Sequence, residues 1–253
     1  MRINKVLNWY TKSYYRSARG QESGRGLINV AKEAMGGDRV IYKKIKKIII
    51  KFLIGYFYWP TTWPTSIDPP TSEFLYGLTR LMYPRVAVEI GTYKGNAAIA
   101  IGQALKDNGR GVLHTIDPVE QELVYTAIRK SGFKSTVFFH KGFSGDVIPR
   151  LNLSYIDLVF IDGDHSYESV RKDFELVAHL IPKGGVIVFH DVLVDIAQGF
   201  DGPRRVIEEI QKLKEWRVNI YSTEAGVNKG NKVVLRGDNP DFKPLGLAVC
   251  IKI

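Results

Sequence analysis

Short apolar runs alternate with amphipathic segments from about residue 73 to the end of the chain. The runs are rich in Val and Ile, which is typical of strands buried on both faces of a parallel sheet. Helical spacing of apolar residues separates them, so the pattern predicts a doubly wound, mostly parallel α/β sheet of seven strands. Strands are expected at Val86–Ile90, Val112–Ile116, Thr136–His140, Ile156–Ile161, Val186–His190, Val218–Ser222 and Leu247–Ile251, the last being the candidate for an antiparallel strand. Helices are expected at Glu73–Met82, Ala97–Lys106, Glu120–Ser131, Ser169–Leu180 and Pro203–Trp216.

The first 72 residues follow a different pattern. At helical spacing, residues 40–59 place isoleucines and aromatic side chains on one face and lysines on the other. Five lysines between residues 43 and 51 argue against a helix that spans a membrane. The prediction is a basic, helical N-terminal extension of residues 1–72, with an amphipathic helix at about 40–59, followed by an α/β domain of residues 73–253.

The net charge of +10 belongs to this extension. The first 80 residues hold 14 Lys and Arg against 5 Asp and Glu, whereas the remainder holds 22 against 21. The single cysteine, Cys250, excludes an intramolecular disulfide and a cysteine-based metal cage, and it is compatible with a reducing compartment. The first residues lack the apolar run and cleavage site of a signal peptide, so a cytoplasmic location is expected.

Alternative roles for the helix of residues 40–59 remain open. It packs on the α/β domain or on a second copy in a homo-oligomer, or it lies on an anionic membrane surface as a peripheral anchor. Nucleic acid is not expected as a partner, because no known nucleic-acid-binding motif accompanies the charge.

Glycines and acids follow the expected strands at the edge where such sheets bind ligands. Gly91 and Gly95 come directly after the first strand and let a ligand approach the backbone and the next helix. Tyr93 stands where a dinucleotide fingerprint requires glycine, which disfavours a nicotinamide or flavin dinucleotide. Asp117 ends the second strand and suits the two hydroxyls of a ribose, or it caps a helix before Pro118.

Five motifs occur in register. Glu-x-Gly-x-Tyr-x-Gly at Glu89, Gly-x-Ser-x-Asp-x-Ile-Pro at Gly142, Asp-x-Val-Phe-x-Asp at Asp157 and Gly-Gly-Val-x-Val-x-x-Asp-Val at Gly184 appear in this order, and Asp-Gly-Asp-His-Ser-Tyr-Glu starts at Asp162. Together they resemble the catechol O-methyltransferase-like branch of the class I S-adenosylmethionine-dependent methyltransferases. The last motif also resembles the bacterial group with cephalosporin-hydroxylase-like and sugar O-methyltransferases. The resemblance covers about residues 84–253.

The resemblance implies a Rossmann-like methyltransferase fold and an S-adenosylmethionine-binding catalytic domain at residues 73–253. It implies that Glu89 and Gly91 hold the methionine end of the cofactor, with Tyr93 alongside and Gly95 opening the next helix. Asp117 would accept the ribose hydroxyls. The remaining cofactor-binding residues that it implies are Ser144 and Gly145 at the adenine, and Asp162.

The resemblance also implies a divalent metal, magnesium or manganese, held by Asp162, His190 and Asp191. His190 departs from the family pattern, because a carboxylate or amide stands there in its relatives. A histidine beside two aspartates shifts preference toward manganese, iron or zinc, or indicates that no metal is bound. His165 occupies the position of the family's catalytic lysine and suits a general base, while its alternative role is to cap the next helix or to bond Asp191.

The resulting hypothesis is methyl transfer to a hydroxyl of a small molecule or glycan, with His165, Asp162 and Asp191 as the catalytic residues. A second hypothesis is a metal-dependent glycosyltransferase that uses Asp162-Gly163-Asp164 as its Asp-x-Asp motif. A third is a non-catalytic membrane-surface protein that retains the fold. The intact acids at the strand ends favour the first.

Overall fold

The computed structural model describes residues 67, 69–120, 132–193, 201–222, 225–227, 233–235 and 243–253. Most of the predicted extension, including its helix at 40–59, and most of the predicted helix Glu120–Ser131 lie outside these residues, while α4 (Pro69–Met82) begins within the range predicted for the extension. Within the described ranges, no helix has the length and apolar character needed to cross a membrane.

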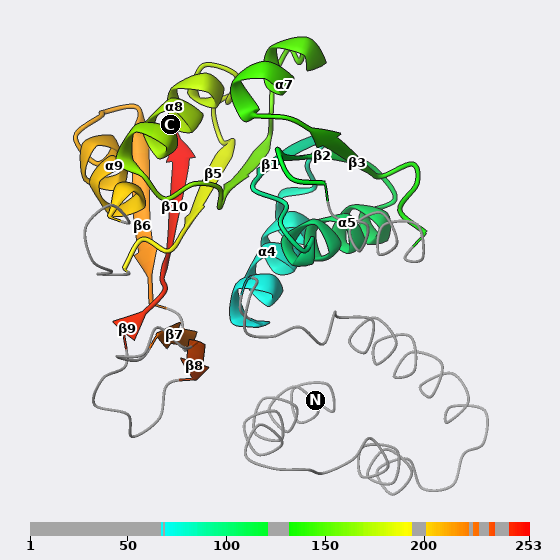
Figure 1. Ribbon diagram of the computed structural model, residues 1–253. Coiled ribbons are helices and arrows are strands. Elements are labelled where there is room, and N and C mark those ends of the chain that lie inside the picture. Colours follow the sequence, from blue (N-terminus) through cyan, green and yellow to red (C-terminus); the bar gives the residue numbers. More distant parts are fainter. Residues whose placement is uncertain are drawn as a thin grey trace, which may run out of the picture. The chain divides into compact units, whose positions relative to one another are not determined.

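A seven-stranded sheet forms the centre of the domain, with strand order β3-β2-β1-β4-β5-β10-β6 (Figure 1). The strands β1 to β5 are mutually parallel, and β10 pairs antiparallel with both β5 and β6. This confirms the predicted doubly wound, mostly parallel sheet and its reversed last strand. The strands are β1 (Val86–Ile90), β2 (Val112–Asp117), β3 (Val137–Lys141), β4 (Leu158–Ile161), β5 (Val186–His190), β6 (Trp216–Tyr221) and β10 (Leu247–Lys252).

Helices cover both faces of this sheet, and each face has its own apolar core. One core packs α4 and α5 against the sheet, and the other packs α7, α8 and α9 against the opposite face. Alternate residues along β4 divide between the cores, with Leu158 and Phe160 on the first side and Val159 and Ile161 on the second. The helices are α4 (Pro69–Met82), α5 (Asn96–Asn108), α7 (Ser144–Leu151), α8 (Tyr167–Ala178) and α9 (Gly202–Ile210).

Three differences from the sequence predictions concern local structure. The helix α7 was not predicted, and its last turn contains Pro149. The helix predicted at Pro203–Trp216 ends at Ile210, and turns lead from there into β6. A small second sheet of order β8-β7-β9 was also not predicted, with β7 (Ala225–Val227), β8 (Val233–Leu235) and β9 (Lys243–Pro244).

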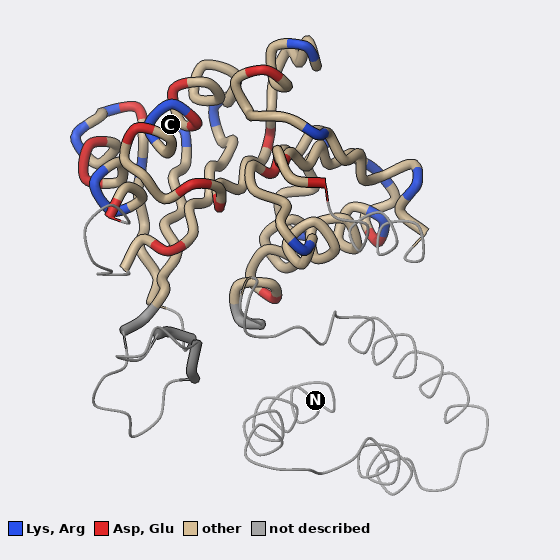
Figure 2. The backbone as a smooth tube through the Cα atoms, viewed as in Figure 1, with Lys and Arg blue, Asp and Glu red and all other residues tan. Residues whose placement is uncertain are grey.

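Charges of both signs are interspersed over the described part of the chain (Figure 2). This agrees with the near-neutral count for residues 81–253. Surface charge therefore does not mark a site, and the candidate functional acids are those that are buried or that follow the ends of strands.

Candidate active site

A cavity of about 1010 Å³ opens at the carboxyl ends of β1, β2, β4 and β5. It brings together residues that are distant in the chain, among them Glu89 and Asp191. All of the predicted site residues line this cavity except Gly95, which caps α5. The parallel topology explains the convergence, because the strand ends meet at one edge of the sheet.

The loop after β1 passes close to the loop after β4. Gly91 adopts a φ of 94°, and its NH donates to the carbonyl of Ile116 at 2.9 Å. A Cβ at Gly91 would stand 2.1 Å from the carbonyl oxygen of Asp162. Only glycine fits there without displacing the backbone that carries Asp162. Tyr93, next in this loop, also has a positive φ of 43° and is 45% exposed.

Asp117 fastens the same loop to the end of β2. Its Oδ2 accepts a hydrogen bond from the NH of Tyr93 at 2.7 Å, and its Oδ1 accepts one from the NH of Val119 at 2.8 Å. Each carboxylate oxygen can accept more than one hydrogen bond, so both still have capacity for ligand hydroxyls. The bond to Val119 closes a local turn, whereas the bond to Tyr93 orients the loop at the cavity.

Glu89 is fully buried on β1 and lines the cavity. The hydroxyl of Thr115 donates to its Oε2, and in the described residues its Oε1 has no hydrogen-bond partner. Burial raises the pKa of Glu89 to about 8, and the negative charges of Asp162 and Asp117 add to the increase. A buried acid with an unpaired oxygen is placed to receive a positively charged ligand group.

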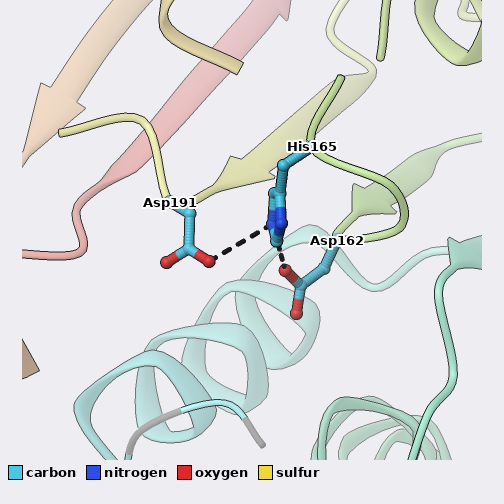
Figure 3. Close-up of side chains that lie close together, drawn as sticks. All are labelled: Asp162, His165 and Asp191. Atoms are coloured by element: carbon cyan, nitrogen blue, oxygen red, sulfur yellow. Dashed lines mark ion pairs between the residues drawn. The ribbon is translucent and has the colours of Figure 1, made fainter. Parts of the chain in front are cut away.

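Asp162, His165 and Asp191 form a polar centre in the cavity (Figure 3). The Nε2 atom of His165 lies 3.2 Å from Asp191 Oδ2 and 3.7 Å from Asp162 Oδ1. Asp162 follows β4, and Asp191 follows β5 with a φ of 56°, a conformation that aspartate tolerates better than most residues. Each of the three residues offers one ligand atom, and these atoms lie within 4.8 Å of one another.

His190 lies behind this centre and is only 4% exposed. Its Nδ1 is 3.2 Å from both Asp162 Oδ1 and Asp191 Oδ1, and its Nε2 is 3.4 Å from Thr71 Oγ1 on α4. The structure thus brings together the three predicted metal ligands, but it adds His165 to them. The contribution of Thr71 was not predicted, since nothing in the sequence connects α4 to the end of β5.

The two histidines and Asp191 have pKa values that depend on their neighbours. Burial lowers the pKa of His165, but Asp162 and Asp191 outweigh this effect and raise the pKa to about 10. Burial also opposes a charged His190, whose pKa the same two carboxylates raise well above its usual range. Burial would raise the pKa of Asp191, yet the histidines lower it. The four groups therefore form a charge-paired cluster.

Two neighbouring residues have local roles. Ser166 is the N-cap of α8, with its side chain accepting from the NH of Ser169 at 3.3 Å, so His165 does not cap this helix. Asp164 Oδ1 accepts from the NH of Ser166 at 2.6 Å. Asp164 is thus occupied in the turn before α8 and is outside the group of potential metal ligands, which weakens the Asp-x-Asp hypothesis.

Asp173 is a cavity residue that the sequence analysis did not identify. It is 6% exposed on α8 and accepts a hydrogen bond from the hydroxyl of Ser144. Its spacing was a usable signal, because Val170, Asp173 and Val177 share the buried face of α8. An acid within an apolar stripe indicates either a paired or a functional group.

The fold is that of a class I methyltransferase domain. The reversed last strand, the glycine loop after β1 and the acids at the strand ends are those that the resemblance led us to expect. Residues 88–192 match the family model described as a methyltransferase domain. This part of the chain is therefore similar to methyltransferase domains.

Individual relatives are similar to parts of the chain. A catechol O-methyltransferase of Niastella koreensis is 29% identical over 133 residues, covering 51% of this chain and 59% of the relative. A caffeoyl-CoA O-methyltransferase of Mesembryanthemum crystallinum is 30% identical over 149 residues, covering 56% and 57%. The chain thus spans less than two thirds of the length of these curated relatives.

A solved structure agrees over nearly the whole fold. The O-methyltransferase TomG of Streptomyces achromogenes, crystallised with S-adenosylmethionine, superposes with a TM-score of 0.62 at 20% identity. The match covers 96% of each chain. It confirms the Rossmann-like methyltransferase fold.

Proposed function

We propose that the protein is an S-adenosylmethionine-dependent O-methyltransferase that acts on a hydroxyl of a small molecule. The cavity supports this most directly, because Glu89, Asp117 and Ser144 line it together with Asp162, His165 and Asp191. The first group suits the ammonium, ribose and adenine of the cofactor. The second suits an acceptor hydroxyl and its proton.

Methyl transfer from a sulfonium requires alignment more than activation, since the leaving group is already reactive. The chain would hold the cofactor by Glu89 and Asp117 and leave its methyl group facing the polar centre. His165 would accept the acceptor's proton at Nε2, with Asp162 and Asp191 stabilising the imidazolium that forms. In this role the imidazole must be neutral before the reaction. The acceptor or a cation therefore has to weaken the pairing of His165 with Asp162 and Asp191, which favours the protonated imidazole.

The polar centre fits a divalent cation. Asp162, His165 and Asp191 provide converging oxygen and nitrogen atoms that lie within 4.8 Å of one another. The carboxylates raise the pKa of both histidines, and a dication would take over this balance of positive charge against them. When bound, such an ion would lower the pKa of an acceptor hydroxyl. The mixed donors favour manganese over magnesium.

Calorimetric titration of the full-length protein with S-adenosylmethionine tests the proposal. We expect saturable binding at one site per chain, followed by release of S-adenosylhomocysteine when catechols and other hydroxylated acceptors are supplied. Chelation and re-addition of magnesium or manganese then assigns the metal requirement. A folded protein that binds uridine or guanosine diphosphate sugars instead would favour the glycosyltransferase hypothesis.

Replacing His165 with asparagine should separate chemistry from cofactor binding. We expect acceptor turnover to fall about ten- to a hundredfold, because a positioned base is lost, while the affinity for S-adenosylmethionine changes less than about twofold. His179→Asn, at the exposed C-cap of α8, is the matched control and should leave both quantities unchanged. Undiminished turnover in the His165 variant would show that the base lies elsewhere.

The amphipathic helix predicted at residues 40–59 supports a further proposal, peripheral binding to an anionic membrane and thus a glycan or lipophilic acceptor at its surface. Changing three of its lysines to glutamine in the full chain should lower cosedimentation with phosphatidylglycerol vesicles severalfold, since each basic residue contributes about 1 kcal/mol. A matched triple change at exposed lysines of the α/β domain should not. The variants are Lys44, Lys47 and Lys51 to Gln against Lys134, Lys183 and Lys214 to Gln. Equal cosedimentation of the two triple variants would reject membrane binding by this helix. The remaining roles would be packing on the α/β domain or contact with a second copy in a homo-oligomer.

A further inference from the structure

Asp173 has an unusual environment for a surface-helix acid. Its side chain is buried yet lines the cavity, 29 residues after Ser144, whose hydroxyl donates to its Oδ1. In the described part of the chain, Ser144 is the only group that a hydrogen bond joins to this carboxylate. Burial raises the pKa of Asp173 to about 6, so the group is mostly ionised at neutral pH. A buried carboxylate of this kind needs a further donor.

The second oxygen of Asp173 faces the gap between two loops of the site. A Cβ placed on Gly163, in the loop after β4, would lie 3.8 Å from Asp173 Oδ2. On the other side, Ser144 and Gly145 begin α7 directly after β3. The carboxylate thus connects the two loops that border the adenine end proposed above.

Gly145, the residue after Ser144, leaves open space at the start of α7. A Cβ at Gly145 would meet no atom within 4 Å, so the space next to it is open. Without a side chain, Gly145 can offer a base only its own backbone groups. An adenine ring placed there still needs an acceptor for its exocyclic amine, because that amine carries two donor hydrogens.

We propose that Asp173 accepts a hydrogen bond from the exocyclic amine of the cofactor's adenine, and that it selects adenine over hypoxanthine. Hypoxanthine has a carbonyl oxygen in place of the amine, and a carboxylate repels that oxygen. A site built to bond one donor rejects an analogue that lacks it, since the buried acceptor is left unpaired. Asp173 is therefore a specificity residue for the base, held in place by Ser144.

A purely structural role makes a different prediction. If Asp173 only fastens α7 to α8 through Ser144, its replacement would weaken S-adenosylhomocysteine and S-inosylhomocysteine equally. The ratio of the two affinities therefore separates the roles, and a general loss of stability does not change it.

The experiment is calorimetric titration of the full-length protein with S-adenosylhomocysteine and with S-inosylhomocysteine. We expect the wild type to prefer the adenine compound by about ten- to a hundredfold. In Asp173→Asn the amide can donate to the hypoxanthine oxygen, so the preference should fall below about threefold. Glu175→Gln, an exposed acid of the same helix that pairs with Arg171, is the matched control and should keep the wild-type ratio.

Each outcome is decisive. A wild type that binds both compounds equally overturns the assignment of Asp173 whether or not the variant folds, and so does an unchanged preference in Asp173→Asn. Because the assignment rests on the proposed cofactor, failure of the wild type to bind either compound would reject the proposed function itself. Binding of S-adenosylhomocysteine with loss of base preference only in the Asp173 variant supports both.

Discussion

Replacing Gly91 with alanine should abolish measurable binding of S-adenosylmethionine and destabilise the fold by about 3 kcal/mol or more. The new methyl group would stand 2.1 Å from the carbonyl oxygen of Asp162, and the backbone at this position has a φ of 94°. The neighbour is backbone rather than a flexible side chain, so relief requires the loops after β1 and β4 to separate. That separation displaces Asp162 and the glycine loop together.

The measurements are urea unfolding and calorimetric titration of the purified protein. Gly77→Ala is the matched control, because Gly77 lies in α4 and a Cβ there would meet nothing within 4 Å. We expect that change to be neutral or to stabilise the protein by up to about 1 kcal/mol. A Gly91→Ala protein that binds the cofactor normally would show that the two loops are free to move apart.

Replacing Glu89 with glutamine should have opposite effects on binding and on stability. Affinity for S-adenosylmethionine should fall about a hundredfold, because the proposed partner of the cofactor's ammonium loses its charge. The protein without cofactor should become more stable above pH 5, because the glutamine never ionises in its buried position. Few substitutions strengthen a fold while removing its ligand.

The direction of the pH effect follows from the pKa of Glu89, which rises from 4.5 to about 8 on folding. Between these values the folded state holds a proton that the unfolded state has released, so stability falls as pH rises. The wild type should lose up to about 5 kcal/mol relative to Glu89→Gln across this interval. Urea unfolding at pH 5 and pH 8 measures the growing difference, and Glu215→Gln, an exposed acid paired with Lys252, should show none.

Proton release provides an independent measurement. If the cofactor's ammonium pairs with Glu89, binding at pH 7 should expel close to one proton, because the ion pair brings the pKa of Glu89 back down. Titration in buffers of different ionisation enthalpy counts this proton. Binding without proton release in the wild type would place the ammonium away from Glu89.

The sequence was sufficient for the sheet and for the positions of the site acids. The runs at β1 and β5 have the predicted bounds, because both strands are buried and end at a glycine or an acid. The helix α7 escaped prediction because Gly145 and Pro149 both oppose helical propensity within its eight residues. The helix α9 was predicted too long, since the apolar spacing continues into Leu213 although the chain has already turned.

The sequence alone could not predict which side chains of the site pair with one another. Periodicity places His165, His190 and Asp191 at two strand ends, but it cannot show that both imidazoles meet the same pair of carboxylates. The contact of Thr71 with His190 joins residues 119 positions apart and depends on how α4 packs on the sheet. The role of Asp173 likewise depends on the approach of α7 to α8.

The attachment of α9 to the catalytic loop bears on how the enzyme could change its substrates over evolutionary time. The NH of Gly202 donates to the carbonyl of His165 at 3.2 Å, and a Cβ at Gly202 would stand 2.4 Å from that oxygen. At the other end, Leu193 is fastened to Leu245 two residues after Asp191. The chain between residues 193 and 202 thus starts and finishes at fixed points beside the reacting groups. If the proposed function holds, insertions and substitutions between those points leave the anchored residues beside Asp191 and His165 in place, so selection can diversify this segment without rebuilding the cluster.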